Sequence, residues 1–255
     1  MPLDTRWLSM TRGVPFENVR LQLATLMKKR MAMIITIDGP AGAGKSTAAR
    51  MLAERLGFEF LDTGAMYRAV AWACVDGNVD LTATAAVTAT ASGISINFED
   101  QRIICNGQDV TAAIRSADAG HAASIVAAVP GVRLEMVRLQ RESADGHSCV
   151  TEGRDQGSVV FPDSECKFFL TADPRERAER RLQELQALGQ SESIDEVLAQ
   201  IVDRDERDRT RDVGPLVMAE DAVEVDTSGQ TIDQVVDFLE STSRERLGRS
   251  NQTTV

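Results

Sequence analysis

The stretch at residues 34–56, IITIDGPAGAGKSTAARMLAERL, contains the residues that decide the fold. Residues 39–46 match the pattern G-x-x-x-x-G-K-[ST] at every fixed position. The apolar run at residues 34–37 predicts a buried strand, and the apolar residues after Ser46 recur at helical spacing until Gly57, a favourable helix stop. A strand, a glycine-rich turn and a helix in this order form a P-loop.

This loop predicts a phosphate-binding site. Its glycines let successive backbone N–H groups point into one hollow at the positive end of the following helix. Lys45 is placed to reach the outer phosphates of a nucleotide, and the Ser46 hydroxyl is placed to ligate Mg²⁺. The nucleotide-binding residues expected here are Gly39, Pro40, Ala41, Gly42, Ala43, Gly44, Lys45, Ser46 and Thr47.

The net charge of −11 limits the possible partners. A negative surface repels a nucleic-acid backbone, so we expect no nucleic-acid partner. The same surface repels free nucleotides, so a nucleotide site needs a local cluster of arginines and lysines. The four cysteines lack C-x-x-C spacing and the chain has two histidines, a pattern that favours buried reduced thiols over a zinc site.

The chain shows no apolar run of membrane-spanning length and no signal-peptide pattern, so we expect a soluble, cytoplasmic protein without a membrane partner. Strand-like and helix-like segments alternate, which favours one α/β domain with a parallel sheet. We expect a flexible N-terminal extension at 1–32, this domain at 33–249 and a C-terminal tail at 250–255.

Further strands are predicted at residues 58–61, 148–151, 166–170 and 222–226, and helices at 80–92, 116–128 and 131–143. Alternation at 94–98 and 102–106 predicts a hairpin that interrupts the α/β rhythm. Capping boxes at Asp173, Ser193 and Thr231 predict three more helix starts.

Charged residues gather where predicted strands end. Arg68 and Arg154 closely follow two strands, and ligands of open α/β sheets bind at these carboxyl ends. Glu152 is a candidate to act on the metal through water, with Asp62 as a second candidate. The alternative for Glu152 is an ordinary charge at a strand end.

Two predicted helices near residues 173–210 carry arginines at regular spacing. A solvated charged face is the commoner reason for such a pattern. After a P-loop sheet, the arginines also suit a moving helical hairpin that closes over reacting phosphates and excludes water. The two sets are Arg177, Arg180 and Arg181 on one helix face, and Arg204, Asp208 and Arg211 on another.

No nucleophile or general base stands out, since neither His121 nor His147 has an evident partner. An acceptor that is itself a phosphate is already ionised and needs no base.

Five stretches together resemble the bacterial cytidylate (CMP) kinases: IDGPAGAGKST, LDTGAMYR, the segment from Ser124 to Arg133, TEGRDQGSVVFPD and RDERDRTRDVGPL. The resemblance runs from about residue 34 to about residue 239. It implies an α/β P-loop nucleoside monophosphate kinase fold of three layers, with a parallel central sheet. It also implies a helical lid at about 173–210 and a small β-rich insert at about 80–112 in the monophosphate-binding region.

The resemblance also implies roles for particular residues. Catalysis would use Lys45, Arg154, Arg177, Arg181 and Arg211, with ATP at the P-loop and Mg²⁺ at Ser46 and Glu152. The acceptor phosphate and its surroundings would contact Thr63, Tyr67, Arg68, Gly153, Arg154 and Arg211. Cytosine would lie near Ser124, Arg133 and Asp155, and the ribose near Arg204 and Asp208. Thr63 replaces a common Ser, and Gln156 stands where an apolar residue is usual.

The expected reaction is ATP + CMP ⇌ ADP + CDP, with dCMP as an alternative acceptor and a monomeric enzyme. Another small-molecule P-loop kinase, such as a UMP/CMP or adenylate kinase, is the nearest alternative. A P-loop GTPase or a non-catalytic nucleotide-binding module is a second, and the chain lacks the N-K-x-D guanine motif of the former.

Overall fold

The computed structural model describes residues 32–99, 102–187 and 189–252. At its centre lies a five-stranded sheet in the order β2-β6-β1-β7-β8, in which every neighbouring pair is parallel. The predicted parallel sheet is therefore confirmed. Its strands are β1 (Ile34–Asp38), β2 (Glu59–Asp62), β6 (Cys149–Gly153), β7 (Cys166–Thr171) and β8 (Val223–Asp226).

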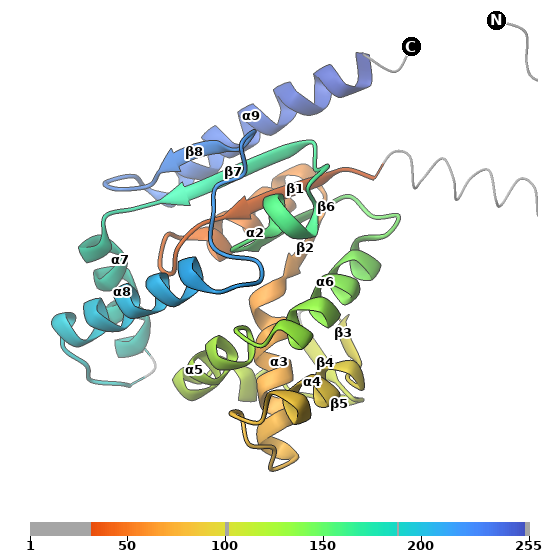
Figure 1. Ribbon diagram of the computed structural model, residues 1–255. Coiled ribbons are helices and arrows are strands. Elements are labelled where there is room, and N and C mark those ends of the chain that lie inside the picture. The colour runs from red at the N-terminus through yellow and green to blue at the C-terminus, as the bar shows by residue number, and fades with distance from the viewer. Residues whose placement is uncertain (1–31, 100–101, 188, 253–255) are drawn as a thin grey trace, which may run out of the picture.

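Two helices, α2 (Lys45–Leu56) and α9 (Ile232–Gln252), pack against each other and against the sheet (Figure 1). Leu52 and Leu239 meet Ile35 and Phe168 in one buried apolar cluster. Burial of these side chains holds the helix that follows the P-loop firmly against the strand that precedes it. The last helix reaches Gln252, three residues beyond the boundary expected at 249.

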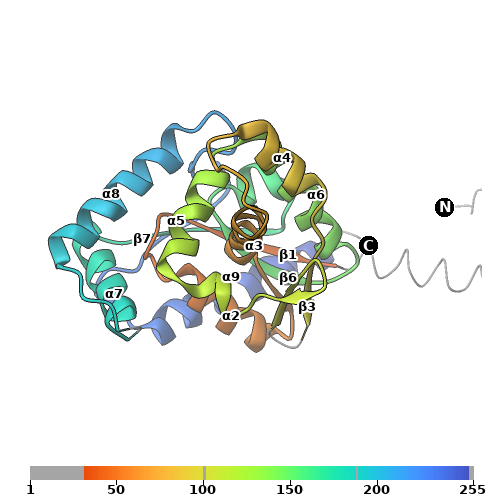
Figure 2. The ribbon, with the colours of Figure 1, turned by 90° about the horizontal axis from the view of Figure 1, so that it is seen from below.

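A second unit surrounds α3 (Thr63–Asp76) and has its own core, which includes Met66, Val126 and Met136 (Figure 2). The predicted hairpin is present and gains a third strand. Pro130 is the first residue of α6, where its missing N–H costs nothing. The unit comprises α4 (Thr84–Ser92), β3 (Ile96–Glu99), β4 (Arg102–Cys105), β5 (Gln108–Asp109), η2 (Ala113–Arg115), α5 (Ala117–Val126) and α6 (Pro130–Ala144).

The helices α7 (Pro174–Ala187) and α8 (Ile194–Thr210) form a hairpin to one side of the sheet (Figure 1). The capping boxes at Ser193 and Thr231 are both present. The expected box at Asp173 is incomplete. Asp173 accepts from two backbone N–H groups, but Glu176 bonds Arg180 and the Gly229 N–H instead of returning to Asp173.

A short π-helix, η3 (Gln156–Val160), follows β6. The proposed extension at 1–32 lies almost wholly outside the described residues. Within the described residues, no helix is long and apolar enough to cross a bilayer.

Gly39 provides a test of the fold at the start of the P-loop. Its φ of +145° is one that side chains rarely adopt, and an added Cβ would lie 2.0 Å from the Leu170 carbonyl oxygen. We expect Gly39→Ala to lower the free energy of unfolding by at least about 2 kcal/mol, measured by urea denaturation.

Gly248→Ala is the matched control, because Gly248 lies in α9 with open space around it. This change should raise stability by up to about 1 kcal/mol. Equal stabilities of the two variants would contradict the packing described for Gly39.

Candidate active site

A cavity of about 870 Å³ opens at the carboxyl ends of the central strands, within the size range of small-molecule sites. Its walls come from the P-loop, from α3 and α5, from the end of β6 and from the α7–α8 hairpin. The strand order places it there, because β1 and β6 are neighbours although 114 residues of chain lie between their facing ends, Asp38 and Gly153. Ligands of open α/β sheets bind in such a crevice.

The P-loop forms one wall of this cavity. Gly42 and Gly44 have positive φ values of 75° and 84°, and α2 begins directly at Lys45. The Lys45 ammonium donates to the Pro40 carbonyl at 2.7 Å. Burial, reinforced by the Arg154 cation, lowers the pKa of Lys45 to about 7.

Residues 41–47 all line the cavity, whereas Gly39 and Pro40 do not. That Gly39 and Pro40 belong to the nucleotide-binding loop stays a prediction. Gly39 lies against β7, and Pro40 turns its carbonyl to Lys45. Their role is to shape the loop.

Two oxygen-bearing side chains meet at the candidate metal position. The Ser46 hydroxyl donates to Glu152 at 3.0 Å, across the junction of α2 and β6. Asp62 is less available as a metal ligand, since its side chain accepts a hydrogen bond from the Ala65 N–H and pairs with Arg68 at 3.5 Å. Burial, with the Glu152 charge beside it, raises the pKa of Asp62.

Hard oxygen donors suit Mg²⁺, so Ser46 and Glu152 fit this ion. The part of the chain that the structure describes holds no group of three or more histidine, cysteine or acidic side chains arranged for a metal. A magnesium ion here would therefore take its remaining ligands from phosphate oxygens and water.

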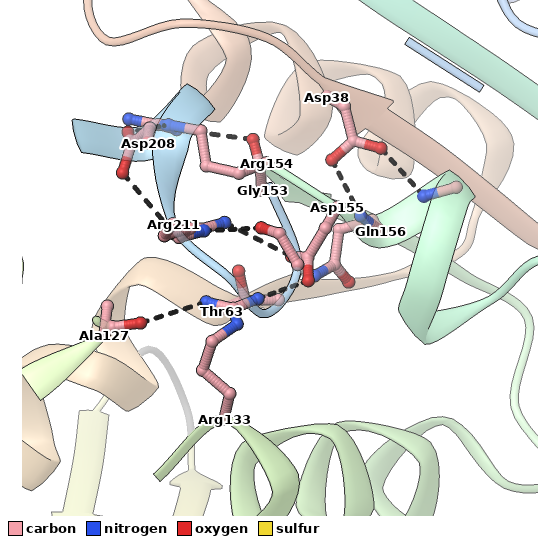
Figure 3. A network of polar contacts seen from close by, with 12 residues as sticks. Asp38, Thr63, Ala127, Arg133, Gly153, Arg154, Asp155, Gln156, Asp208 and Arg211 are labelled. Carbon is pink, nitrogen blue, oxygen red and sulfur yellow. Dashed lines mark hydrogen bonds and ion pairs between the residues drawn. The ribbon is translucent and has the colours of Figure 1, made fainter. Parts of the chain in front are cut away.

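Arginines also line the cavity, and Figure 3 shows Arg154 and Arg211 beside Asp208. Arg154 pairs with Asp208 at 2.7 Å, and Arg211 donates to the same carboxylate at 3.4 Å. Burial acts to raise the Asp208 pKa, but Arg154 and Arg204 outweigh it and the pKa is lowered. Asp208 is thus held as a carboxylate among cations.

The expectation that Arg211 lies on the same helix face as Arg204 and Asp208 is wrong. The helix α8 ends at Thr210, and Arg211 has an extended backbone. Its guanidinium folds back to the Gly214 carbonyl at 2.5 Å, while the Leu216 N–H bonds the Asp208 carbonyl. The turn at 211–216, not helical spacing, brings Arg211 to Asp208.

Four arginines lining the cavity hold a buried N–H for which the described residues offer no hydrogen-bond acceptor. The groups are Nε of Arg68, Arg133 and Arg204 and Nη2 of Arg211. Burial and the nearby Arg154 lower the pKa of Arg204 to about 10, so Arg204 remains cationic at neutral pH. Unpaired buried donors are costly, and an anionic ligand rich in acceptors would satisfy them.

A second arginine–carboxylate pair lies deeper in the cavity (Figure 3). Arg133 donates to Asp155 in a short hydrogen bond, and Arg211 approaches the other Asp155 oxygen at 4.0 Å. The Arg133 guanidinium lies over the Tyr67 ring, 5.6 Å from its centroid. Burial raises the pKa of Tyr67 to about 12, so Tyr67 is a neutral phenol here.

The remaining predicted residues also reach the cavity, with one exception. Thr63 donates to the Glu152 carbonyl at 2.6 Å, and the Gly153 carbonyl accepts from Arg154. Ser124 accepts from Arg207 at 3.0 Å, so Arg207, which sequence reasoning missed, joins α8 to α5. Arg181 lines the cavity while pairing with Glu184 at 2.9 Å.

The exception is Arg177, which is buried away from the cavity. It pairs with Asp205 at 2.6 Å and does not line the cavity. The catalytic role expected for Arg177 is therefore corrected. Asp205 was not singled out from the sequence, because an acidic residue in a charge-rich helix has no distinguishing pattern.

The sheet, the P-loop and a cavity lined with cations under a helical hairpin define a P-loop kinase. Residues 35–244 match the family model described as cytidylate kinase. The chain is 46% identical over 221 residues to a cytidylate kinase of Shewanella loihica, covering 85% of this chain and 96% of that one. It is 42% identical over 223 residues to a cytidylate kinase of Aeromonas salmonicida, covering 86% and 97%. The chain belongs to the cytidylate kinase family.

The lowered pKa of Lys45 predicts that nucleotide binding takes up a proton. At pH 8 an amine of pKa about 7 is mostly neutral, and a bound phosphate favours its charged form. ADP binding at pH 8 should therefore take up about 0.5–0.9 proton, measured by calorimetry in two buffers of different ionisation enthalpy.

The Lys45→Met variant at saturating ADP is the control and should lose this uptake. Equal binding heats for the wild type in both buffers would show that Lys45 is already protonated before ADP binds.

Proposed function

We propose that this protein transfers the γ-phosphoryl group of ATP to CMP, giving ADP and CDP, with dCMP as a second acceptor. The observation that carries the proposal is the set of four unsatisfied arginine N–H groups beside the P-loop. A second phosphate-bearing ligand facing the loop would satisfy them. The printed names of the relatives support cytidylate as that ligand.

In the proposed reaction an oxygen of the CMP phosphate attacks the γ-phosphorus, and the bond from that phosphorus to the bridging β-phosphate oxygen breaks. The attacking phosphate is already ionised, so no side chain has to remove a proton. Lys45, Arg154 and Arg211 would align the two phosphates and stabilise the charge that spreads over the transferring group. Arg181 would approach from the hairpin.

Mg²⁺ held at Ser46 and Glu152 would neutralise charge on the β- and γ-phosphate oxygens of ATP. The α7–α8 hairpin would act as a lid, because it carries cations into the same cavity and its closure would exclude water that otherwise competes as acceptor.

Hydrogen-bond polarity supports cytosine at the Arg133–Asp155 end. Cytosine offers an amino donor at position 4 and an acceptor at N3, and uracil reverses both. Asp155 only accepts and Arg133 only donates, while Ser124 does either. Asp155 already accepts a hydrogen bond from Arg133. A carboxylate has about four lone-pair sites, so Asp155 can also accept a hydrogen bond from the amino group of cytosine. Arg204 and Asp208 would then lie at the ribose.

A coupled assay with ATP and a panel of nucleoside monophosphates tests this function. We expect turnover with CMP and dCMP, and loss of most of it in a folded Lys45→Met variant, because the charge on the outer phosphates then lacks a cation. Equal turnover with AMP would favour a broader kinase, and no turnover with any monophosphate would favour a nucleotide-binding module.

Base selection has its own test at Arg133. The wild type should prefer CMP to UMP by about 100-fold or more in kcat/KM, which corresponds to roughly 2.7 kcal/mol. Arg133→Met should shrink this ratio, mainly by weakening CMP, because uracil never used the Arg133 donor.

Arg138→Met is the matched control on the same helix, since Arg138 is half-exposed and pairs only with Glu135 and Glu142 among the described residues. The ratio should not change in this control. If Arg133→Met lowers kcat/KM for both nucleotides equally, Arg133 serves phosphate or structure instead of the base.

A further inference from the structure

The buried ion pair of Arg177 and Asp205 lies at the root of the α7–α8 hairpin. Arg177 belongs to α7 and Asp205 to α8, and their side chains are 5% and 4% exposed. The guanidinium and carboxylate are 2.6 Å apart. Neither residue lines the cavity, so a direct role in phosphoryl transfer does not explain the pair.

Both members of the pair also bind the backbone of one P-loop residue, Ala41. The Ala41 N–H donates to Asp205 at 3.2 Å, and the Ala41 carbonyl accepts from Arg177 at 2.9 Å. Both backbone polar groups of Ala41 are thereby held, one by a side chain from each lid helix. The guanidinium is itself fixed by a second bond, from its Nε to the Ala172 carbonyl at 3.1 Å.

The next residue shows how closely the loop follows the hairpin. A Cβ added to Gly42 would lie 3.0 Å from both the Cβ and the carbonyl oxygen of Arg177. Gly42 also has a φ of +75°, which side chains rarely adopt. The loop backbone therefore lies directly on α7 at Gly42, the first of the residues 42–45 whose N–H groups are expected to face phosphate.

Stability alone is a poor reason for such a pair. Taking two charges out of water is costly, and apolar side chains of similar volume often stabilise a protein as well or better. Rotation about the backbone bonds of Ala41, in contrast, would change the orientation of the backbone at residues 42–45. A carboxylate on the Ala41 N–H also keeps that donor out of the set that faces phosphate.

We propose that Arg177 and Asp205 are a positioning pair for the ATP site. They fix the backbone on both sides of the Ala41 Cα, so that the N–H groups of residues 42–45 are already oriented when phosphate arrives. They also connect the base of the hairpin to the P-loop. The inference rests on the proposed function only in taking ATP as the ligand of this loop.

The decisive experiment compares single and double variants of the full chain. Arg177→Met and Asp205→Leu each leave one buried charge unpaired, so each should lower the melting temperature strongly. Arg177→Met/Asp205→Leu removes both charges and should recover much of that loss. The Ala41 N–H and carbonyl still lack their side-chain partners in the double variant, so its Kd for ADP should still be weaker by about tenfold, with the KM for CMP changed less than about twofold.

Arg175→Met is the matched control. Arg175 lies on α7 in an exposed pair with Glu179, and this change should alter neither the melting temperature nor the ADP Kd. A double variant with a recovered melting temperature and a wild-type ADP Kd would overturn the proposal, because the pair would then serve stability alone.

Asp205→Asn provides a second test that stands if the double variant does not fold. The amide keeps an oxygen for the Ala41 N–H but loses the charge that faces Arg177. ADP should bind more tightly to Asp205→Asn than to Asp205→Leu, because only the amide retains an acceptor for the Ala41 N–H, and equal ADP affinities in the two variants would overturn the proposal. ADP binding is measured without CMP, so a wild type that fails to phosphorylate CMP would refute the proposed function and leave this test intact.

Discussion

The parallel pairing of β1 with β6 is the constraint on which the active site depends. Their register sets Ile37 opposite Glu152 and Asp38 opposite Gly153, so the P-loop and the turn after β6 leave the sheet side by side. The Asp38 carboxylate then joins the two segments by accepting the N–H groups of Gln156 and Gly157, each at 2.8 Å (Figure 3). Burial raises the pKa of Asp38 to about 6, and the two N–H bonds oppose that rise.

The cations of the site are held in place by carboxylates. Asp155 pairs with Arg133 and Asp208 pairs with Arg154, and each carboxylate fixes its partner without using all the guanidinium N–H groups. The chain carries a net charge of −11, yet this cavity gathers positive charge. Donors that are fixed before the ligand arrives need little reorganisation, which is the condition under which electrostatic stabilisation is strongest.

Gln156 shows how a polar side chain is accommodated in the protein interior. Its amide accepts from Thr151 at 2.9 Å and donates to Gln140 at 3.1 Å, in a fully buried position. A Cβ on Gly153 would come within 2.8 Å of the Gln156 side chain, so the glycine leaves room for the amide. The cost of burying the amide is met by these partners.

The sequence by itself determined the P-loop, the parallel sheet and the chemistry of the cavity, because these depend on local patterns. A complete G-x-x-x-x-G-K-[ST] pattern between a strand and a helix predicts a P-loop. The helix caps at Ser193 and Thr231 form with residues only three positions further along the chain. The motifs around Arg154 and Arg211 predicted the right residues at the cavity, although helical spacing was the wrong reason for Arg211.

Only the tertiary structure decided which charged residues face the ligand and which face one another. Arg177 and Arg181 are one turn apart on the same helix and look equivalent in sequence, yet Arg181 lines the cavity and Arg177 is buried against Asp205. Asp205 and Arg207 acquire partners at Ala41 and Ser124, far away in the chain. The sequence position of a charged residue does not identify its ion-pair or hydrogen-bond partner. That partner depends on how two helices pack, and not on spacing along either helix.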